Sequence, residues 1–152
     1  MIAVTAEDSF LRRFLSFIKC VYTIPMPTAN KKIAIIDDDP LILDLYVRKF
    51  TERGYKILAT NDRDFSMEKL LAFTPKILLL DINMPTKSGL DILKEIRETS
   101  KTPLYTILLT NNDEKTLMEK GRSLGANEYI VKVSKTPAEI ADIVDTVLQS
   151  LS

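Results

Sequence analysis

The chain has 152 residues, of which 45% are hydrophobic, and its 21 basic residues balance its 21 acidic ones. This length and composition suit one globular domain with a full-sized core. The net charge is zero and no basic stretch is longer than Lys31-Lys32, so there is no electrostatic footprint for nonspecific nucleic-acid binding. We therefore expect no direct nucleic-acid partner.

The sequence contains no histidine and one cysteine, Cys20. An internal disulfide, a Cys/His metal site and histidine-based acid–base catalysis are therefore excluded. A reducing, cytoplasmic setting is the simplest interpretation. Any chemistry must depend on carboxylates, lysine, tyrosine, hydroxyl groups and bound ions.

Residues 1–30 differ in pattern from the rest of the chain. Apolar residues recur at spacings of three and four between Phe10 and Val21, with basic residues among them, which predicts an amphipathic helix. The segment is too short and too charged to span a bilayer, and it fits a signal peptide poorly. Two interpretations stay open: a helix that docks on a membrane surface or a partner, or an extension of little consequence, since Met26 would also make a sensible start. We place the folded domain at residues 31–152.

From Lys31 onward, short apolar runs alternate with segments of helical spacing. Continuously apolar runs of this length are typical of strands buried on both faces of a sheet. There are five: KIAIID (32–37), KILAT (56–60), KILLLD (76–81), LYTILLT (104–110) and EYIVK (128–132).

Helices are predicted between and after these strands, with 63–73 the weakest stretch. The apolar positions are Ile42, Leu45, Tyr46 and Phe50; Leu90, Leu93 and Ile96; Leu117, Gly121 and Leu124; and Ile140, Ile143, Val144, Val147 and Leu151. Asp39-Pro40 has the pattern of a helix start, and Thr136 with Glu139 that of a capping box. The alternation implies an α/β fold: a doubly wound, five-stranded parallel sheet of the flavodoxin-like (βα)5 type, with helices on both faces.

Polar residues collect where the predicted strands end, at Asp37-Asp38-Asp39, Asp81, Thr110 and Lys132. In an open parallel sheet these carboxyl ends form the ligand-binding edge. Two carboxylates ~4 Å apart repel by about 4 kcal/mol at an effective dielectric near 20, so a cation must offset them. An oxygen-only cluster favours a hard divalent ion, and Mg²⁺ suits two or three carboxylates plus a backbone carbonyl.

Four segments, IIDDDP, LLLDINMPTKSGLD, ILLTN and YIVK, in this order and spacing, resemble the receiver domain of two-component response regulators, here of the single-domain type. The resemblance covers residues 31 to about 150. It implies that Asp81 accepts a phosphoryl group from a sensor histidine kinase or phosphotransfer protein. It also implies that output passes to a downstream protein target through the face around residues 112–145, and a homodimer is compatible with it.

The resemblance also implies roles for the other residues at this edge. Asp37 and Asp38, with Asp81 and the Asn83 backbone carbonyl, would hold Mg²⁺. Thr110 and Lys132 would contact the phosphoryl oxygens. Tyr129 would be the aromatic residue that turns inward when Thr110 is drawn toward the phosphoryl group. Asp39, by contrast, has the position of a helix N-cap, and any charge that it lends to the metal site is secondary.

Two positions depart from the family pattern. Val133 follows Lys132 where proline is usual and the peptide is commonly cis; a cis Lys-Val bond would cost about 3 kcal/mol, and a trans peptide would shift the lysine. Asn111 follows Thr110 where a small residue is usual, which predicts narrowed access to the phosphoryl site and slower turnover.

Three classes of function remain. The first is a phosphoacceptor switch or relay with no enzymatic activity beyond its own phosphorylation and dephosphorylation. The second is a phosphatase of the haloacid-dehalogenase type, but that class places an acid where this chain has Asn83. The third is a degenerate receiver that binds or dimerises without phosphorylation. Nucleotide binding is not expected, because none of the glycines has the spacing of a phosphate-cradling loop.

Overall fold

The computed structural model of the chain describes residues 31–151, so the helix predicted within residues 1–30 lies outside the described part. The elements follow one another as β1 (Lys32–Ile36), α2 (Pro40–Glu52), β2 (Lys56–Thr60), α3 (Met67–Phe73), β3 (Ile77–Asp81), α4 (Gly89–Thr99), β4 (Tyr105–Thr110), α5 (Lys115–Ser123), β5 (Glu128–Val131), the 3-10 turn η2 (Lys132–Ser134) and α6 (Pro137–Ser150). The five strands form one parallel sheet in the order β2-β1-β3-β4-β5. The predicted doubly wound α/β fold is confirmed.

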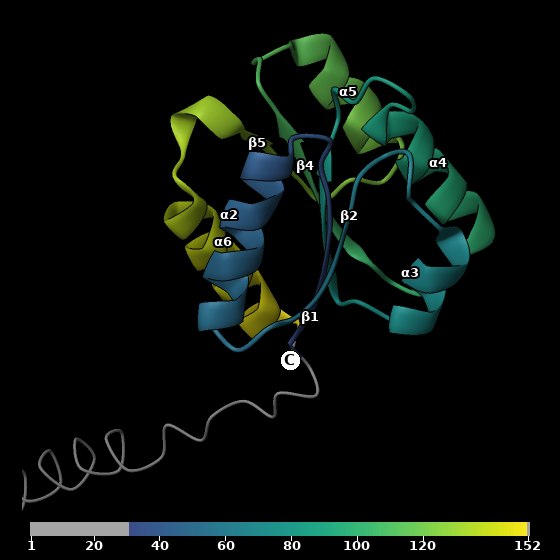
Figure 1. Cartoon of the computed structure of the whole chain (residues 1–152). Helices are drawn as coiled ribbons and strands as arrows, with labels where there is room; N and C mark the ends of the chain where they lie inside the picture. Colours follow the sequence, from purple (N-terminus) through teal and green to yellow (C-terminus); the bar gives the residue numbers. More distant parts are fainter. Residues whose placement is uncertain (1–30, 152) are drawn as a thin grey trace, which may run out of the picture.

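Helices cover both faces of the sheet: α2 and α6 lie on one face, and α3, α4 and α5 on the other (Figure 1). Because alternate residues of a strand point to opposite faces, each central strand contributes to two cores. In β3, Ile77 and Leu79 pack with α2 and α6, whereas Leu78 and Leu80 pack on the other side. The central strands β1, β3 and β4 are thereby buried on both faces, whereas the edge strands β2 and β5 are partly exposed. The carboxyl ends of all five strands lie at one edge of the sheet.

The caps that limit the helices agree with the sequence pattern. The Asp39 carboxylate accepts hydrogen bonds from the Leu41 and Ile42 backbone N–H groups, so α2 begins directly after the acidic cluster. Thr136 and Glu139 form the predicted capping box at α6. The starts of these two helices are therefore set locally, by side chains that accept hydrogen bonds from the first free N–H groups.

Three helix predictions need correction. Leu45 and Leu151 belong to the apolar patterns that predicted α2 and α6, but they are 48% and 49% exposed, so neither is part of the core. The weak helical pattern over 63–73 corresponds to a short α3 that starts at Met67, because the Ser66 hydroxyl caps it by accepting from the Lys69 N–H. Residues 61–66 instead form a turn and an irregular loop at the site edge of the sheet.

Candidate functional site

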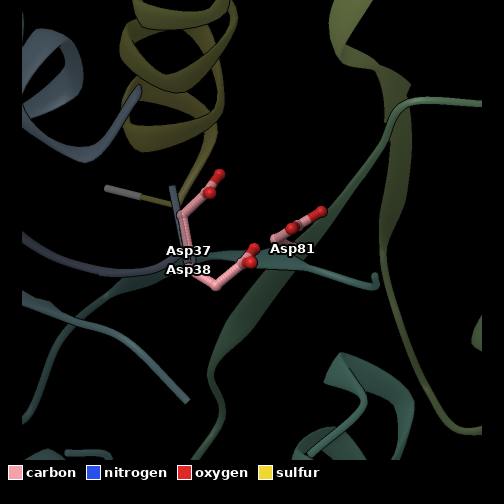
Figure 2. A group of neighbouring side chains, drawn as sticks. All are labelled: Asp37, Asp38 and Asp81. Atoms are coloured by element: carbon pink, nitrogen blue, oxygen red, sulfur yellow. The ribbon is translucent and has the colours of Figure 1, made fainter. Parts of the chain in front are cut away.

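The acidic residues meet because β1 and β3 are neighbours in the sheet. The register pairs Ile36 with Leu80, so Asp37 and Asp81 follow side by side at the strand ends. One carboxylate oxygen from each of Asp37, Asp38 and Asp81 lies within 4.8 Å of the other two. Figure 2 shows these three side chains as neighbours at the ends of the two strands. The predicted acidic cluster is therefore present in the structure.

Asp37 is fully buried and has a partner for each carboxylate oxygen. Oδ1 accepts from the Asp39 backbone N–H at 3.0 Å, and Oδ2 accepts from the Lys132 ammonium at 3.0 Å. Burial raises the pKa of Asp37, and the contact with Lys132 opposes this rise only in part. Asp38 retains solvent exposure, so the cluster combines a buried wall with an open side.

Asp81 is 1% exposed, and its Oδ1 has no hydrogen-bond partner among residues 31–151. The Lys132 Nζ lies 3.3 Å from that oxygen, an ion-pair distance without hydrogen-bond geometry. Burial raises the pKa of Asp81 to about 6, with Asp37 adding to the rise and Lys132 opposing it. A buried carboxylate oxygen without a hydrogen-bond donor is costly, so the charge of Asp81 must be offset by the Lys132 ammonium and by any cation that the acidic cluster binds.

Lys132 brings its positive charge to both buried acids. It begins the η2 turn directly after β5, and its side chain is 10% exposed. Burial alone would lower the pKa of Lys132, but Asp37 and Asp81 outweigh burial and raise it. The Lys132–Val133 peptide bond is trans, which avoids the free-energy cost of a cis bond before a residue other than proline. The Lys132 ammonium group nevertheless contacts both Asp37 and Asp81.

The residues at this edge fit the predicted Mg²⁺. The cluster offers carboxylate oxygens only, as a hard divalent cation prefers, and the buried Asp81 Oδ1 has no hydrogen bond among the described residues, although Lys132 lies 3.3 Å away. Asn83 lies two residues after Asp81, in the loop between β3 and α4, and its side-chain Nδ2 donates to the Thr110 hydroxyl at 3.2 Å. Its backbone carbonyl as a metal ligand stays a prediction.

The loop after Asp81 folds back on the end of β3, and Gly89 makes this possible. The Ile82 carbonyl oxygen accepts from the Met84 and Gly89 backbone N–H groups at 3.2 and 3.0 Å. A Cβ atom at Gly89 would lie 2.0 Å from the Asp81 carbonyl oxygen, a separation that no side chain can occupy. Glycine is therefore required here for close approach of the backbones, and α4 starts directly beside the strand that carries Asp81.

Thr110 and Tyr129 lie on the β4–β5 side of the site and are connected through Asn112. The Thr110 hydroxyl accepts from the Asn112 backbone N–H at 3.3 Å, and the Tyr129 hydroxyl donates to the Asn112 carbonyl oxygen at 3.0 Å. Thr110 is fully buried, whereas Tyr129 is partly exposed and packs against the core formed with α3, α4 and α5. The two predicted switch residues are thus both hydrogen-bonded to the backbone of Asn112.

Asp62, which follows β2 at the same edge, was not predicted as a site residue. It is 7% exposed, and its carboxylate accepts from the Thr86 and Lys87 backbone N–H groups in the loop after Asp81. No spacing rule pointed to it, since it lies in a polar stretch with the pattern of an ordinary turn. The only available signal was that Asn61-Asp62 gives a third strand with an acidic residue directly after it or at its end.

Comparisons with known proteins agree with this geometry. The model of the response regulator receiver domain matches residues 33–145, which lie within the predicted domain. The chain therefore belongs to the response regulator receiver domain family. This membership favours the receiver interpretation over the phosphatase class.

Solved structures share the fold. The chemotaxis protein CheY4 of Vibrio cholerae has 22% identity and a TM-score of 0.69, with 76% of this chain and 97% of that chain covered. A CheY-like receiver domain protein of Methanospirillum hungatei has 22% identity and a TM-score of 0.71, with coverage of 79% and 94%. A chain of the CheX–CheY–BeF3–Mg²⁺ complex of Borrelia burgdorferi has 26% identity and a TM-score of 0.67, with coverage of 76% and 87%.

Within residues 31–151, every helix is too short or too polar to cross a bilayer.

Proposed function

We propose that the chain is a phosphorylation-dependent signalling switch in which Asp81 accepts a phosphoryl group with the help of Mg²⁺ held by Asp37, Asp38, Asp81 and the Asn83 carbonyl. The observation that carries this proposal is the buried Asp81 oxygen, which lacks a hydrogen-bond partner in the described chain, beside two further acids and a buried lysine. Family membership supports the same function.

The transfer follows from the residues at the edge of the sheet. At neutral pH Asp81 is mostly ionised, since its pKa of about 6 lies below 7. One carboxylate oxygen attacks the phosphorus atom; the P–N bond of a phosphohistidine breaks, and the departing imidazole nitrogen keeps the bonding electrons and takes up a proton. Bound Mg²⁺ would supply positive charge to the phosphoryl oxygens. Lys132 offsets the charge that develops on the same oxygens, and it needs no rearrangement because it already contacts Asp81.

The donor in this proposal is a sensor histidine kinase or phosphotransfer protein. It must bring its phosphohistidine to the edge where Asp81 lies. Two exposed apolar side chains are close in sequence to residues of that edge. Leu41, two residues after Asp39, is 76% exposed, and Val133, directly after Lys132, is 80% exposed. Exposed apolar residues beside a transfer site are suited to a transient protein contact. A reducing, cytoplasmic setting, as expected for a protein with one cysteine, belongs to the same proposal.

The output in this proposal passes through Thr110 and Tyr129. A phosphoryl group on Asp81 adds acceptor oxygens, which draw the Thr110 hydroxyl away from Asn83 and Asn112. The Asn112 backbone N–H then loses the Thr110 hydroxyl as its acceptor, so residue 112 is held less firmly. Because the Tyr129 hydroxyl is bonded to the carbonyl oxygen of the same residue, Tyr129 is freed to turn inward. The readout surface is the face of α5, β5 and α6, where a groove of about 360 Å³ is lined by residues that include Met118, Arg122, Tyr129, Lys135 and Ile143.

The proposal is tested by incubating the protein and an Asp81→Asn variant with acetyl phosphate, with and without Mg²⁺. In this reaction the P–O bond to the acetyl group breaks and acetate leaves. The expected result is a mass increase of one phosphoryl group in the parent protein only, and only with Mg²⁺. A parent protein that gains no phosphoryl group, or a variant that gains as much, would show that the proposal is wrong.

A further inference from the structure

Asp62 lies in the loop between β2 and α3, and it is held against a different loop. Both of its backbone hydrogen bonds end on one oxygen: Oδ2 accepts from the Thr86 N–H at 2.6 Å and from the Lys87 N–H at 3.2 Å. Charge-assisted bonds of this kind are about twice as strong as neutral ones. A carboxylate 24 residues earlier in the sequence therefore fixes the middle of the loop that follows Asp81.

That loop carries residues of the proposed site. It starts directly after Asp81 and contains Asn83, whose side chain also holds the Thr110 hydroxyl. The Ile82 carbonyl anchors the two ends of the loop, through Met84 and Gly89. Asp62 anchors the part between them, at Thr86 and Lys87. The position of Asn83 thus depends on the Ile82 carbonyl and on the Asp62 carboxylate.

Asp62 is itself held in place by its neighbours. The Asn61 Oδ1 accepts from the Arg63 and Asp64 backbone N–H groups at 3.0 and 2.8 Å, which closes a tight turn around Asp62. One residue before that turn, the Thr60 carbonyl oxygen accepts from the Asp37 backbone N–H at 3.2 Å. The segment 60–64 therefore touches the backbone of Asp37 on one side and the loop after Asp81 on the other.

The state of the Asp62 carboxylate agrees with this role. Burial alone would raise its pKa, but the hydrogen bonds from Thr86 and Lys87 outweigh burial and lower it. The ionised form is thus the one that the loop binds. Within the described chain no lysine or arginine forms an ion pair with Asp62, so the groups that lower its pKa are neutral hydrogen-bond donors, chiefly the Thr86 and Lys87 N–H groups and the Thr86 side chain.

We propose that Asp62 is a positioning residue of the phosphoacceptor site: by holding the Thr86 and Lys87 N–H groups it fixes the loop that presents Asn83 to the metal ion. The inference rests on the proposed function, because it assigns Asp62 to the same Mg²⁺ site. Asp62 touches neither the ion nor the phosphoryl group, and it acts through the loop backbone. Groups that orient metal ligands in this way commonly affect metal affinity by tenfold or more.

The test measures Mg²⁺ affinity of the unphosphorylated protein by NMR titration, together with hydrogen exchange at the Thr86 and Lys87 amides. Asp62→Ala removes the acceptor, and we expect its Kd for Mg²⁺ to rise about tenfold and both amides to exchange faster. Asp62→Asn can place its amide oxygen where Oδ2 lies and keep both bonds, so its Kd should stay within about twofold of the parent value. A Kd for Asp62→Asn close to the parent value would show that the hydrogen bonds of residue 62 are needed for Mg²⁺ affinity and that its charge is not.

Asp64→Asn is the matched control, because it removes the same charge from the same turn at an exposed residue that does not contact the loop after Asp81. Its Kd should be unchanged. If Asp62→Ala does not fold, Asp62→Glu keeps the charge but displaces the carboxylate by one methylene, and it should weaken Mg²⁺ binding several-fold.

Two results would overturn the inference: an Asp62→Ala or Asp62→Glu protein that binds Mg²⁺ like the parent, or an Asp64→Asn protein that binds as weakly as Asp62→Ala. A parent protein whose amide signals do not respond to Mg²⁺ is a different outcome. It would overturn the proposed function itself, and this inference with it.

Discussion

The two sides of the site are held by different forces. On the β1–β3 side, Asp37 and Asp81 are 0% and 1% exposed and share the Lys132 ammonium. On the β4–β5 side, the Thr110 hydroxyl is held by neutral hydrogen bonds of 3.2 and 3.3 Å, and Asn112 lies at the surface. A buried ion pair keeps one geometry, because breaking it leaves a charge without a partner. A neutral hydrogen bond close to the surface can be replaced by a hydrogen bond to water at little cost in free energy.

This difference fits a switch in which chemistry and readout are separate. The acids and the lysine must be in place before a phosphoryl group arrives, so they belong on the rigid side. The hydroxyl and the tyrosine must move afterwards, so they belong on the side with exchangeable bonds. Substitutions on the first side should therefore alter phosphorylation strongly, and those on the second side should alter lifetime or output with smaller effects.

The largest effect is expected for Lys132→Met. The substitution keeps an unbranched side chain but removes the charge that offsets the developing phosphoryl oxygens, which should slow phosphorylation by acetyl phosphate about 100-fold. Rates from a time course of intact-mass spectra give the measurement. Lys135→Met removes a nearby exposed lysine and should react at the parent rate. Equal rates for Lys132→Met and the parent protein would remove Lys132 from the transfer step.

The next effect is on stability, and it depends on pH. Folding raises the pKa of Asp81 from 3.8 to about 6, so between these values the folded protein binds the proton more tightly than the unfolded chain does. The contribution of Asp81 to the free energy of unfolding therefore falls as pH rises from about 4 to about 6, and this loss is complete above that window. Allowing for solvent screening, we expect Asp81→Asn to gain about 2 kcal/mol over the parent protein across the window.

Urea unfolding of both proteins without metal, at several pH values, gives this difference. Asp37, whose pKa is shifted in the same direction, is present in both proteins and largely cancels. A stability difference that does not change between pH 4 and 6 would contradict the desolvation of Asp81. Added Mg²⁺ should reduce the destabilisation of the parent protein at pH 7, because the ion offsets the buried charge.

A smaller effect is expected beside Thr110. The exposed Asn111 side chain lies next to the phosphoryl site in sequence, and we predict that it slows attack by water. Asn111→Ala should shorten the half-life of the phosphorylated protein about three- to tenfold, which corresponds to about 1 kcal/mol in the barrier. Loss of the phosphoryl group from purified protein, followed by intact mass, measures it. A half-life equal to or longer than that of the parent protein would rule the effect out.

The smallest effect is expected for Tyr129→Phe. It removes only the hydrogen bond to the Asn112 carbonyl, which should cost about 0.5–1 kcal/mol of stability and leave the phosphorylation rate unchanged. Urea unfolding and the acetyl phosphate time course measure the two quantities. A phosphorylation rate that falls as far as in Lys132→Met would mean that the two sides of the site are not separate.

The fold could be predicted because its signals are local. Buried parallel strands are continuously apolar, and Asp39 and Thr136 start helices through hydrogen bonds from backbone N–H groups to their own side chains. Gly54, two residues after the end of α2, has a φ of 77°, which favours glycine. The acids at Asp37 and Asp81 were predicted to meet because the carboxyl ends of parallel strands share an edge. These inferences need only strand order and periodicity.

The remaining details depend on contacts that no local pattern encodes. Leu45 has helical spacing but faces solvent, because the periodicity does not say how wide the covered face is. Asp62 looks like a turn residue, and its role follows from a loop 24 residues away. That Lys132 reaches both acids without proline after it depends on the path of the η2 turn. Each of these is set by tertiary packing.

The central claim is that Asp81 is the residue that takes the phosphoryl group because the other acids and the lysine prepare it. Borohydride reduction tests this most directly, since it converts an aspartyl phosphate to homoserine, which peptide mass spectrometry locates. After treatment with acetyl phosphate and Mg²⁺, we predict homoserine at position 81, and none without Mg²⁺. Homoserine at Asp37 or Asp38, or at no position, would contradict the account.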